Sequence, residues 1–351
     1  MCVLGIDTVR EKLLYQTRWL AARGVDVDVL TMHRNEGSIG ADASARIVPL
    51  AQGALPRARQ VVRHLRANRG RLHHVELYVG GRFAVVHALL CRIRRVPLLV
   101  VERGDLLMCQ RRVYPLSARI SIYACYLLAN RIWYKEPYMG RFFARWRPRS
   151  AYFLPNAVPV PAPADTERDL DLLWVNRLVP ERHPDWLADA LAALAQRPRT
   201  AIVGFVGADD PSPRVCELEA RVRTALEPLD HVDCVPFGAP EPYYERARFF
   251  VLPADVVFGN FALLEAMARG VVPIVSDVEG ARDVVDDGVN GIVAAHSAAG
   301  LRAALERALA VPVPAWEAMS AAARATVAER FGLDAWGTRL MEECAAFAAT
   351  A

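Results

Sequence analysis

The sequence predicts an α/β protein of two domains, each built around a parallel β-sheet. Short apolar runs alternate with amphipathic stretches along the 351 residues, which is the pattern of repeated strand–helix–strand units. This length suits two domains better than one. Residues 154–163 contain four prolines, and such a stiff segment is typical of a linker between domains.

The first half contains short apolar or alternating runs that we interpret as buried strands. We expect these strands at 1–7, 25–30, 46–50, 75–79, 98–101 and 131–134. The helices expected between them cover 11–23, 56–71 and 83–92. The apolar segment 114–129 suits either a helix of the core or a helix that touches a membrane.

The second half repeats this alternation after the linker. We expect strands at 171–175, 201–206, 232–236, 249–252 and 271–276, and helices at 186–195, 261–269 and 298–309. Gly280 starts a turn that we expect to lead into a short helix, and a turn at 287–291 precedes a further strand. An amphipathic helix follows Phe331. The loop before helix 261–269 follows a strand, at the edge where open parallel sheets bind ligands.

Composition excludes several classes of protein. No run of about 18 uninterrupted apolar residues occurs, so we expect no membrane span. The first residues lack the basic start and apolar core of a signal peptide. The seven cysteines are odd in number and contain no CxxC pair, which indicates reduced thiols in the cytoplasm and argues against a structural zinc site.

Charge is distributed unevenly between the two halves. Residues 1–150 carry 26 Lys and Arg against 10 Asp and Glu, whereas residues 151–351 carry 17 against 29. The basic half suggests an anionic partner, which could be a phospholipid surface, a lipid pyrophosphate or nucleic acid. The helix expected at 56–71 carries six of these arginines and could lie on an anionic membrane. A solvated surface of biased composition is the alternative explanation of both observations.

One stretch of the second half resembles a known family. The run Glu265-Ala-Met-Ala-Arg-Gly270, followed by Pro273, Gly280 and the turn at 287–291, is similar to the donor-binding signature of the family-4 retaining glycosyltransferases of the GT-B fold. The pair Pro155-Asn156 resembles the family's crossing between domains. The resemblance implies two Rossmann-like domains whose parallel sheets face each other across a cleft. It places an acceptor-side domain at 1–155, with a last helix at 333–351 packing back on it, and a nucleotide-sugar-binding domain at 168–332.

The resemblance also implies roles for individual residues. Residues 176–183 are similar to the family's Gly-Arg-Leu-x-x-x-Lys-Gly, so Arg177 and Arg182 would grip the donor diphosphate. Glu265 would accept hydrogen bonds from the ribose hydroxyls. Backbone amides at the start of its helix would meet the sugar or phosphate, and further side chains would line the donor site. The residues expected to bind the donor in these ways are Gly259, Asn260, Phe261, Leu264, Phe237, Gly238, Arg103 and Asp105. For Arg103 and Asp105 a salt-bridged loop is the alternative.

The signature has one departure that bears on activity. Val257 stands where the family has its first Glu, and the family's Gly-Phe-Gly is replaced by Phe258-Gly259-Asn260. Either the donor sugar differs, or another carboxylate such as Asp255 takes over, or the domain is catalytically weak. The last case leads to an alternative function, a non-catalytic glycosyltransferase-like subunit that binds and activates a partner. No motif beyond charge supports nucleic-acid binding, and we expect none.

The resemblance therefore implies a retaining, hexosyltransferase-type enzyme. It would use a nucleotide diphosphate sugar as donor substrate, with no other cofactor and no catalytic metal. We interpret Asp26-x-Asp28 as strand alternation and Asp209-Asp210 as a turn, not as metal ligands. The acceptor is expected to be lipid-linked or otherwise anionic. The protein is expected in the cytoplasm, with peripheral contact to the inner face of the membrane through the basic half.

Overall fold

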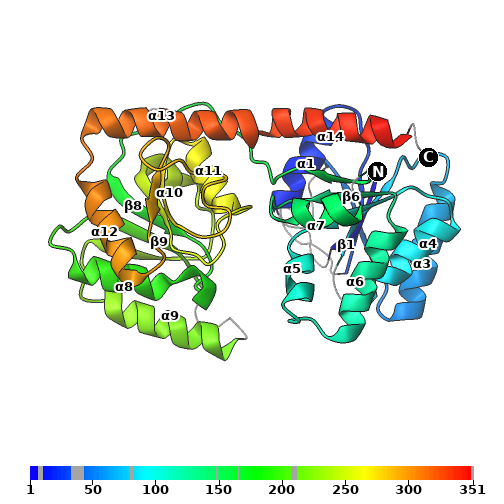
Figure 1. Ribbon diagram of the computed structural model, residues 1–351, viewed down its shortest axis with the longest axis horizontal. Coiled ribbons are helices and arrows are strands. Elements are labelled where there is room, and N and C mark those ends of the chain that lie inside the picture. The colour runs from blue at the N-terminus through cyan, green and yellow to red at the C-terminus, as the bar shows by residue number, and fades with distance from the viewer. Residues whose placement is uncertain are drawn as a thin grey trace. The chain divides into compact units, whose positions relative to one another are not determined.

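The computed structural model describes residues 1–6, 11–32, 43–79, 83–147, 149–164, 166–206 and 212–348. The chain divides into two compact units. Unit 1 comprises Met1–Asn156 and Leu333–Ala351, and unit 2 comprises Ala157–Gly332. Each unit contains one fully parallel sheet with helices packed against it (Figure 1). The α/β class with two parallel sheets is therefore as the sequence predicts.

The sheet of unit 1 has the strand order β3-β2-β1-β4-β5-β6-β7 within the described residues. Its strands are β1 (Cys2–Ile6), β2 (Asp28–Thr31), β3 (Arg46–Pro49), β4 (Val75–Tyr78), β5 (Leu98–Glu102), β6 (Arg131–Tyr134) and β7 (Ala151–Phe153). The order reverses between β1 and β4, which makes this pair the switch point of the sheet. Gly5 lies there with φ +81°, and a Cβ atom on it would be 2.0 Å from the carbonyl oxygen of Tyr78. Only glycine permits this approach.

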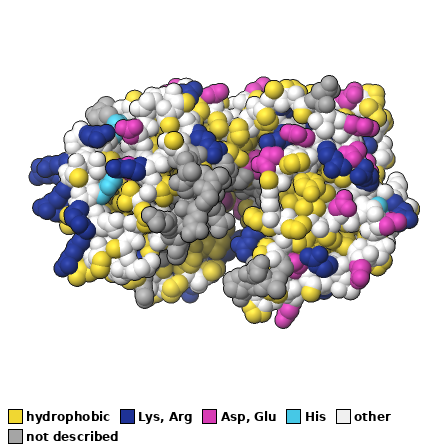
Figure 2. All heavy atoms as spheres, turned by 180° about the vertical axis from the view of Figure 1, so that it is seen from behind, with side chains coloured by type: hydrophobic (Ala, Val, Ile, Leu, Met, Phe, Trp, Pro, Cys, Tyr) yellow, Lys and Arg dark blue, Asp and Glu magenta, His cyan; other side chains and the backbone are white. Residues whose placement is uncertain are grey.

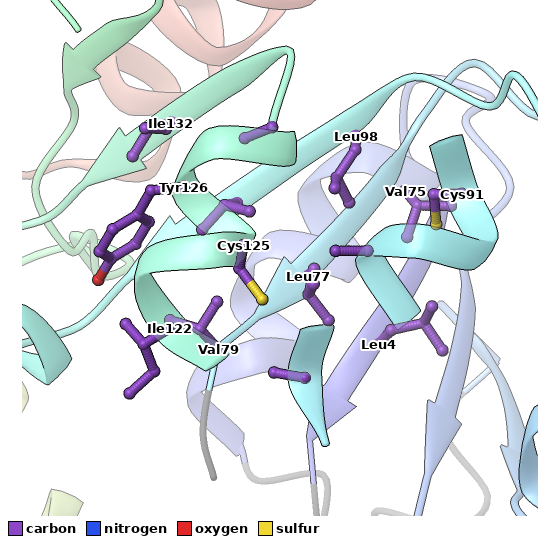
Figure 3. Close-up of a cluster of buried hydrophobic side chains, with 14 of the residues drawn as sticks. Leu4, Val75, Leu77, Val79, Cys91, Leu98, Ile122, Cys125, Tyr126 and Ile132 are labelled. Carbon is purple, nitrogen blue, oxygen red and sulfur yellow. The ribbon is translucent and has the colours of Figure 1, made fainter. Parts of the chain in front are cut away.

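The core of unit 1 lies between the sheet and its helices, as Figure 3 shows for β4, β5 and two of these helices. The helices are α1 (Glu11–Ala21), α3 (Ala54–Ala67), α4 (Ala84–Ile93), α5 (Asp105–Gln110), α6 (Leu116–Leu128), α7 (Met139–Trp146) and α14 (Leu333–Ala348). Helix α14 packs on this unit from the far end of the chain. The Trp19 indole N–H donates to Asp334 at 2.9 Å, and the ring of Trp336 lies 5.8 Å from that of Trp133.

The sheet of unit 2 has the order β10-β9-β8-β11-β12-β13. Its strands are β8 (Leu170–Val175), β9 (Thr200–Phe205), β10 (Val232–Pro236), β11 (Ala247–Leu252), β12 (Val272–Ser276) and β13 (Ile292–Ala294). The helices are η1 (Pro180–Arg182), α8 (Pro184–Ala193), α9 (Pro213–Leu226), α10 (Glu241–Arg246), α11 (Phe261–Ala268), α12 (Ala298–Leu309) and α13 (Val313–Arg330). Here the order reverses between β8 and β11, which are hydrogen-bonded neighbours.

Some local predictions differ from the structure. The short helix expected after Gly280 is a turn. The side chain of Asn290 holds this segment, because it accepts from the amide of Asp286 at 2.7 Å and donates to the carbonyl oxygen of Val284 at 3.2 Å. These bonds replace the backbone bonds that a helix would have made. Among the described helices, none is both long enough and apolar enough to cross a membrane.

Segment 114–129 combines features of both predicted alternatives. Its helix α6 buries Ile122, Cys125 and Tyr126 in the core of unit 1 (Figure 3). The opposite side of the same helix exposes Leu116, Ile120 and Leu127. The helix therefore belongs to the core and also presents an apolar stripe to the surface.

Candidate functional site

The candidate site of unit 2 lies where the order of its sheet reverses. Two loops follow the switch-point strands: residues 176–183 follow β8, and residues 253–260 follow β11. Because β8 and β11 are parallel neighbours, both loops emerge at the same edge of the sheet. Open α/β sheets bind ligands at this place, outside the carboxyl ends of the strands. We call these two segments the switch-point loops of unit 2.

Hydrogen bonds join the two switch-point loops directly. The amide of Asp255 donates to the carbonyl oxygen of Glu181 at 3.1 Å. The guanidinium of Arg182 donates to the carbonyl oxygen of Val256 at 2.8 Å. The Asn260 side chain lies 3.3 Å from that of Asn176, between Nδ2 and Oδ1. A cationic side chain is thus fixed between both loops before any ligand binds.

Arg177 and Arg182 bring positive charge to this edge. Arg177 is exposed, whereas Arg182 is half-buried. Burial lowers the pKa of Arg182 from its ordinary value. A guanidinium has five donor N–H groups in a planar fork and can bind two oxygens of a phosphate at once. The loop therefore offers a site for an anionic ligand.

Helix α11 begins at the same edge and is capped by its own loop. The Asn260 side-chain oxygen accepts from the amide of Leu263 at 2.9 Å, as an N-cap residue should. The Asn260 amide itself donates to the Val257 carbonyl oxygen at 3.4 Å. Gly259 adopts φ +73°, which lets the chain turn into the helix. The structure thus places Gly259, Asn260 and Phe261 at a helix N-terminus, where the dipole favours negative charge.

Glu265 is buried inside unit 2 with 3% of its surface exposed. Its carboxylate accepts a hydrogen bond from the hydroxyl of Tyr244, on α10, at 3.4 Å. Leu264, beside it on α11, is buried in the core. Helix α11 begins at the sheet edge of the arginines, and the Glu265 side chain, one turn inside the helix, packs toward α10.

Phe237 and Gly238 follow β10, at the outer edge of the same sheet. Both are exposed, and Phe237 shows 65% of its surface. The Phe237 amide donates to the carbonyl oxygen of Phe205 at 2.8 Å, which fixes the loop against β9. Strand β9 separates β10 from β8, so this pair flanks the switch-point loops on the β10 side.

Val257 and Asp255 occupy different environments. Val257 is fully buried, and its amide lies 3.4 Å from the carbonyl oxygen of Glu279. Gly280 completes this packing, because a Cβ atom on it would be 2.3 Å from the Cβ of Phe258. Asp255 is exposed, and its Oδ1 lies 2.7 Å from His183 Nε2. The carboxylate nearest to Val257 in sequence is thus engaged by an imidazole.

One group of described side chains could hold a metal ion. The ligand atoms of His183, Asp255 and His296 all lie within 4.8 Å of one another. In unit 1, Asp28 instead makes a bidentate ion pair with Arg46, with both bonds 2.7 Å long. The pair Asp209-Asp210 lies outside the described residues. The absence of a catalytic metal stays a prediction.

In unit 1 the loop after β5 is organised by an acid that sequence reasoning missed. The carboxylate of Glu102 is fully buried and accepts from the amides of Gly104 at 2.6 Å and Leu106 at 3.1 Å, and from the Tyr126 hydroxyl. Burial raises the pKa of Glu102 to about 7, and the nearby Asp105 raises it further. Its signal in the sequence was a lone acid at the end of an apolar run.

Arg103 and Asp105, the two residues predicted in this loop, differ in their exposure to solvent. Asp105 is buried and accepts from the Tyr114 hydroxyl at 3.0 Å, and burial raises its pKa. Arg103 is exposed, with its guanidinium carbon 5.4 Å from the ring centre of Tyr78 at the end of β4. The structure does not bring the two side chains into a salt bridge among its described ion pairs.

Lys135 joins Arg103 at this edge, and sequence reasoning also missed it. Its Nζ donates to Asn156 Oδ1 at 3.0 Å and lies 5.7 Å from the Tyr78 ring centre. Burial lowers the pKa of Lys135 to about 8, and the charge of Arg103 adds to this effect. Since the sequence contains only two lysines, a lysine directly after a strand was the available signal. Neighbouring strands β5 and β6 thus carry cations at their carboxyl ends.

A cavity of about 780 Å³ lies elsewhere in unit 1, bordered by residues such as Met1, Asp26, Asp28, Arg46 and Arg71. These residues lie at or shortly before the amino-terminal ends of β1, β2, β3 and β4. Ligands of open parallel sheets bind at the opposite edge. We therefore do not assign this cavity to the candidate site.

Residues 169–311 match the sequence model of the family described as Glycosyl transferases group 1. The matched segment covers most of unit 2. The chain is also 33% identical over 181 residues to a D-inositol 3-phosphate glycosyltransferase of Frankia alni. That match covers 48% of this chain and 44% of the relative, so less than half of the curated relative's length is spanned.

Solved structures with the same architecture cover nearly all of the chain. Sucrose-phosphate synthase from Thermosynechococcus elongatus has a TM-score of 0.76 at 18% identity, covering 100% of this chain and 99% of its own. Anabaena HepE in complex with UDP and glucose has a TM-score of 0.78 at 16% identity, covering 98% of each chain. A glycosyltransferase from Rickettsia africae has a TM-score of 0.75 at 11% identity, covering 99% and 97%. The chain has the GT-B fold, which confirms the predicted fold class.

Proposed function

We propose that this protein is a glycosyltransferase that moves a sugar from a nucleoside diphosphate sugar to an acceptor. The observation that carries the proposal is the pair of hydrogen-bonded switch-point loops in unit 2, with Arg177 and Arg182 on one of them. These loops lie within the segment that matches the group 1 family. Structures of HepE contain UDP, glucose and UDP-glucose, so UDP-sugars are the donors to test first.

The chemistry requires positive charge at this edge. The bond between the anomeric carbon and the diphosphate breaks while a bond to the acceptor oxygen forms. The departing diphosphate gains negative charge as this happens, and fixed cations lower the barrier by stabilising it. Arg182 is already held by Val256, so little reorganisation is needed when the donor binds. Arg177 would supply the second cation from the exposed part of the same loop.

We propose that the transfer retains the anomeric configuration and needs no metal. The acceptor proton would pass to an oxygen of the leaving diphosphate, on the face from which the new bond forms. Glu265 would accept hydrogen bonds from the ribose hydroxyls. Its present bond to Tyr244 is long, at 3.4 Å, and a shorter bond from a ligand could replace it.

The donor sugar is expected to be held differently from the family pattern. Val257 is buried and apolar, so it offers no oxygen to a sugar hydroxyl. Asp255 could take over, but its Oδ1 already lies close to His183 and His296. We therefore favour an active enzyme whose donor sugar hydroxyls are bound by other groups over a catalytically weak domain.

Unit 1 would receive an anionic acceptor. Arg103 and Lys135 lie at the carboxyl ends of neighbouring strands and both approach Tyr78. Two cations beside one aromatic ring suit a phosphate or carboxylate attached to an apolar body. This arrangement supports a lipid-linked acceptor, or another anionic one.

The surface of unit 1 supports peripheral membrane contact. Neighbouring helices α4 and α6 expose a set of large apolar side chains at helical spacing, namely Phe83, Val86, Leu89, Ile93, Leu116, Ile120 and Leu127. Exposed arginines on α3 and around α4 border this face, and positive side chains gather at the edge of unit 1 in Figure 2. Apolar side chains surrounded by arginines suit the headgroup region of an anionic bilayer. We propose that the inner face of the cytoplasmic membrane is the place of action.

The transferase proposal is tested by nucleotide release. The chain is incubated with a panel of UDP-, GDP- and ADP-sugars, and free nucleoside diphosphate is measured. We expect release from at least one donor, lost in Arg177→Ala and retained in Arg197→Ala, which changes another arginine of unit 2 that pairs with Asp230. Donor binding without release would contradict catalysis, and turnover restored only by a second protein would support the activating subunit instead.

Membrane contact is tested separately by vesicle flotation. We expect binding to vesicles that contain phosphatidylserine and weak binding to pure phosphatidylcholine. Ile93→Asp combined with Ile120→Asp should abolish flotation, whereas Val313→Asp, at a similarly exposed apolar residue of unit 2, should not. Equal flotation of both variants would exclude this face as the membrane contact.

A further inference from the structure

Two imidazoles and a carboxylate come together where the two switch-point loops meet a third loop of unit 2. His183 ends the 3-10 turn η1, Asp255 follows β11, and His296 lies between β13 and α12. Asp255 Oδ1 lies 2.7 Å from His183 Nε2 and 3.2 Å from His296 Nε2. We propose that these three residues bind one divalent transition-metal ion, of which Zn²⁺ is the probe. The site does not depend on the proposed transferase activity.

The spacing of the ligand atoms fits such an ion. Zinc binds imidazole nitrogen and carboxylate oxygen at about 2.0–2.2 Å, so tetrahedral ligand atoms lie roughly 3.3 Å apart. The distance from His296 to Asp255 is close to this value, the distance from His183 to Asp255 is shorter, and all three ligand atoms lie within 4.8 Å. Small movements of the side chains would give the three-ligand geometry.

The imidazole rings are held in place by an aromatic neighbour. The His183 ring stacks on Trp186 with 3.7 Å between ring centres and an angle of 12° between the planes. The His296 ring centre lies 5.1 Å from that of Trp186 and 5.2 Å from that of His183. Helices α8 and α12, which follow the two histidines, pack against each other. The ligands are therefore arranged before an ion binds.

The backbone at His183 is a second, independent observation. His183 adopts φ 44° and ψ 50°, a left-handed conformation that favours glycine. The similar family segment has glycine at this position. Strained residues of this kind concentrate at functional sites, where another demand offsets the strain. Binding of a metal by the side chain is such a demand.

The ligand set selects a class of metal. Two imidazoles and one carboxylate suit Zn²⁺, Co²⁺ and Ni²⁺, whereas Mg²⁺ prefers oxygen ligands only. Three protein ligands leave a coordination position open, as in zinc sites that also bind water or a small ligand. Asp255 and His296 are exposed, so solvent can reach that position. A bound ion would link both switch-point loops to the start of α12.

The first test measures binding by titration calorimetry on the full chain, reduced and treated with a chelator. We expect one Zn²⁺ per chain and no response to Mg²⁺. His296→Ala and Asp255→Asn should each weaken Zn²⁺ binding by at least about tenfold. The matched control is His231→Ala, because His231 also lies beside an aspartate of unit 2, with 3.5 Å between its Nδ1 and Asp230 Oδ1. The control should bind like the parent chain.

The second test separates this site from thiols and from misfolding. The Co²⁺-loaded chain should show visible bands of a site with nitrogen and oxygen ligands, without thiolate charge-transfer bands. His183→Gly removes a ligand but relieves the left-handed backbone, so its unfolding temperature without metal should be equal or higher. Adding Zn²⁺ should raise the unfolding temperature of the parent chain but not that of His183→Gly. Unchanged Zn²⁺ binding in all three ligand variants, or a thiolate spectrum, would overturn the proposal.

Discussion

Unit 1 and unit 2 arrange their strands in the same way around a switch point, yet the carboxyl edges of their sheets are held differently. In unit 2 the loops after β8 and β11 are joined by backbone and side-chain hydrogen bonds, including the one from Arg182 to Val256. In unit 1 the described polar groups gather one strand further along, at β5 and β6. There a buried acid, Glu102, binds its own loop, and Arg103 and Lys135 supply the charge.

This difference suggests that the two units, although similar in fold, serve different functions, donor binding in unit 2 and acceptor binding in unit 1. Loops joined across a switch point hold a cation in a fixed place, which suits stabilisation of a charged leaving group. The loop whose amides bind the buried carboxyl of Glu102 leaves Arg103 exposed beside the half-buried Lys135, which suits recognition of a larger anionic molecule. The predictions below change one unit at a time, so that each tests whether donor and acceptor functions separate in this way.

The largest effect is expected at Arg182. Arg182→Ala removes a cation from the diphosphate and also the bond to Val256, so kcat/KM for the donor should fall by about 10²–10³-fold. Arg182→Lys keeps the positive charge but loses the planar guanidinium, so its kcat/KM should lie between those of Arg182→Ala and the parent chain. Steady-state kinetics measures the change in kcat/KM, and thermal unfolding of each variant checks that it is folded. A kcat/KM within twofold of the parent would remove Arg182 from the donor site.

A smaller loss is expected at Glu265. Glu265→Gln replaces a charged acceptor by a neutral one of the same shape, so the nucleoside diphosphate should bind roughly 10–100-fold more weakly. The fold should persist, because the amide can still accept from Tyr244. Calorimetric titration with the free nucleoside diphosphate measures the change. Unchanged affinity would place the ribose elsewhere.

In unit 1 the buried carboxyl of Glu102 should make stability depend on pH. Its pKa is raised from 4.5 to about 7 in the folded chain, with burial as the main cause. The protonated form is therefore favoured on folding, and its contribution, complete below about pH 4.5, is lost as the pH rises through 7. Between pH 5 and pH 7 the free energy of unfolding should fall by about 2 kcal/mol.

Glu102→Gln is the control for this dependence. The amide keeps an oxygen for the amides of Gly104 and Leu106 but does not titrate. Denaturant unfolding at several pH values should therefore show a flatter profile for the variant than for the parent chain. Identical profiles would mean that Glu102 is ionised in the folded chain at low pH.

The smallest effect is expected at the acceptor side. Arg103→Ala and Lys135→Ala should each raise the acceptor KM by about tenfold while leaving the affinity for the donor nucleotide unchanged. Measuring both constants on the same preparations sharpens the comparison between the units. A loss of donor affinity instead would show that the two edges do not divide the reaction as proposed.

The sequence predicts the parallel sheets because their buried strands are short, apolar and separated by helical patterns. The strand at β11 and the helix at α11 are examples, since both are framed by Pro253, Asn260 and Gly270. Helix α5 was not predicted, because its six residues are too few to show a period. The expected short helix after Gly280 failed because a single side chain, Asn290, stabilises a turn there.

The candidate site was predicted in part, and the limits have physical causes. The resemblance named Arg177, Arg182 and Glu265, and strand order brings the loop of the two arginines and the start of α11 to one edge of the sheet. That Glu265 shares a ligand with the arginines stays a prediction. Sequence periodicity does not reveal that Tyr244, 21 residues earlier, covers the Glu265 carboxylate. Lys135 was missed because its significance arises only when β5 and β6 pair side by side.

The most direct test of the donor site is a crystal structure of the chain with a bound nucleoside diphosphate. We expect the diphosphate oxygens within hydrogen-bond distance of Arg177 and Arg182, beside the start of α11, and the ribose next to Glu265. A nucleotide bound in unit 1, or anywhere away from the loops after β8 and β11, would contradict the account.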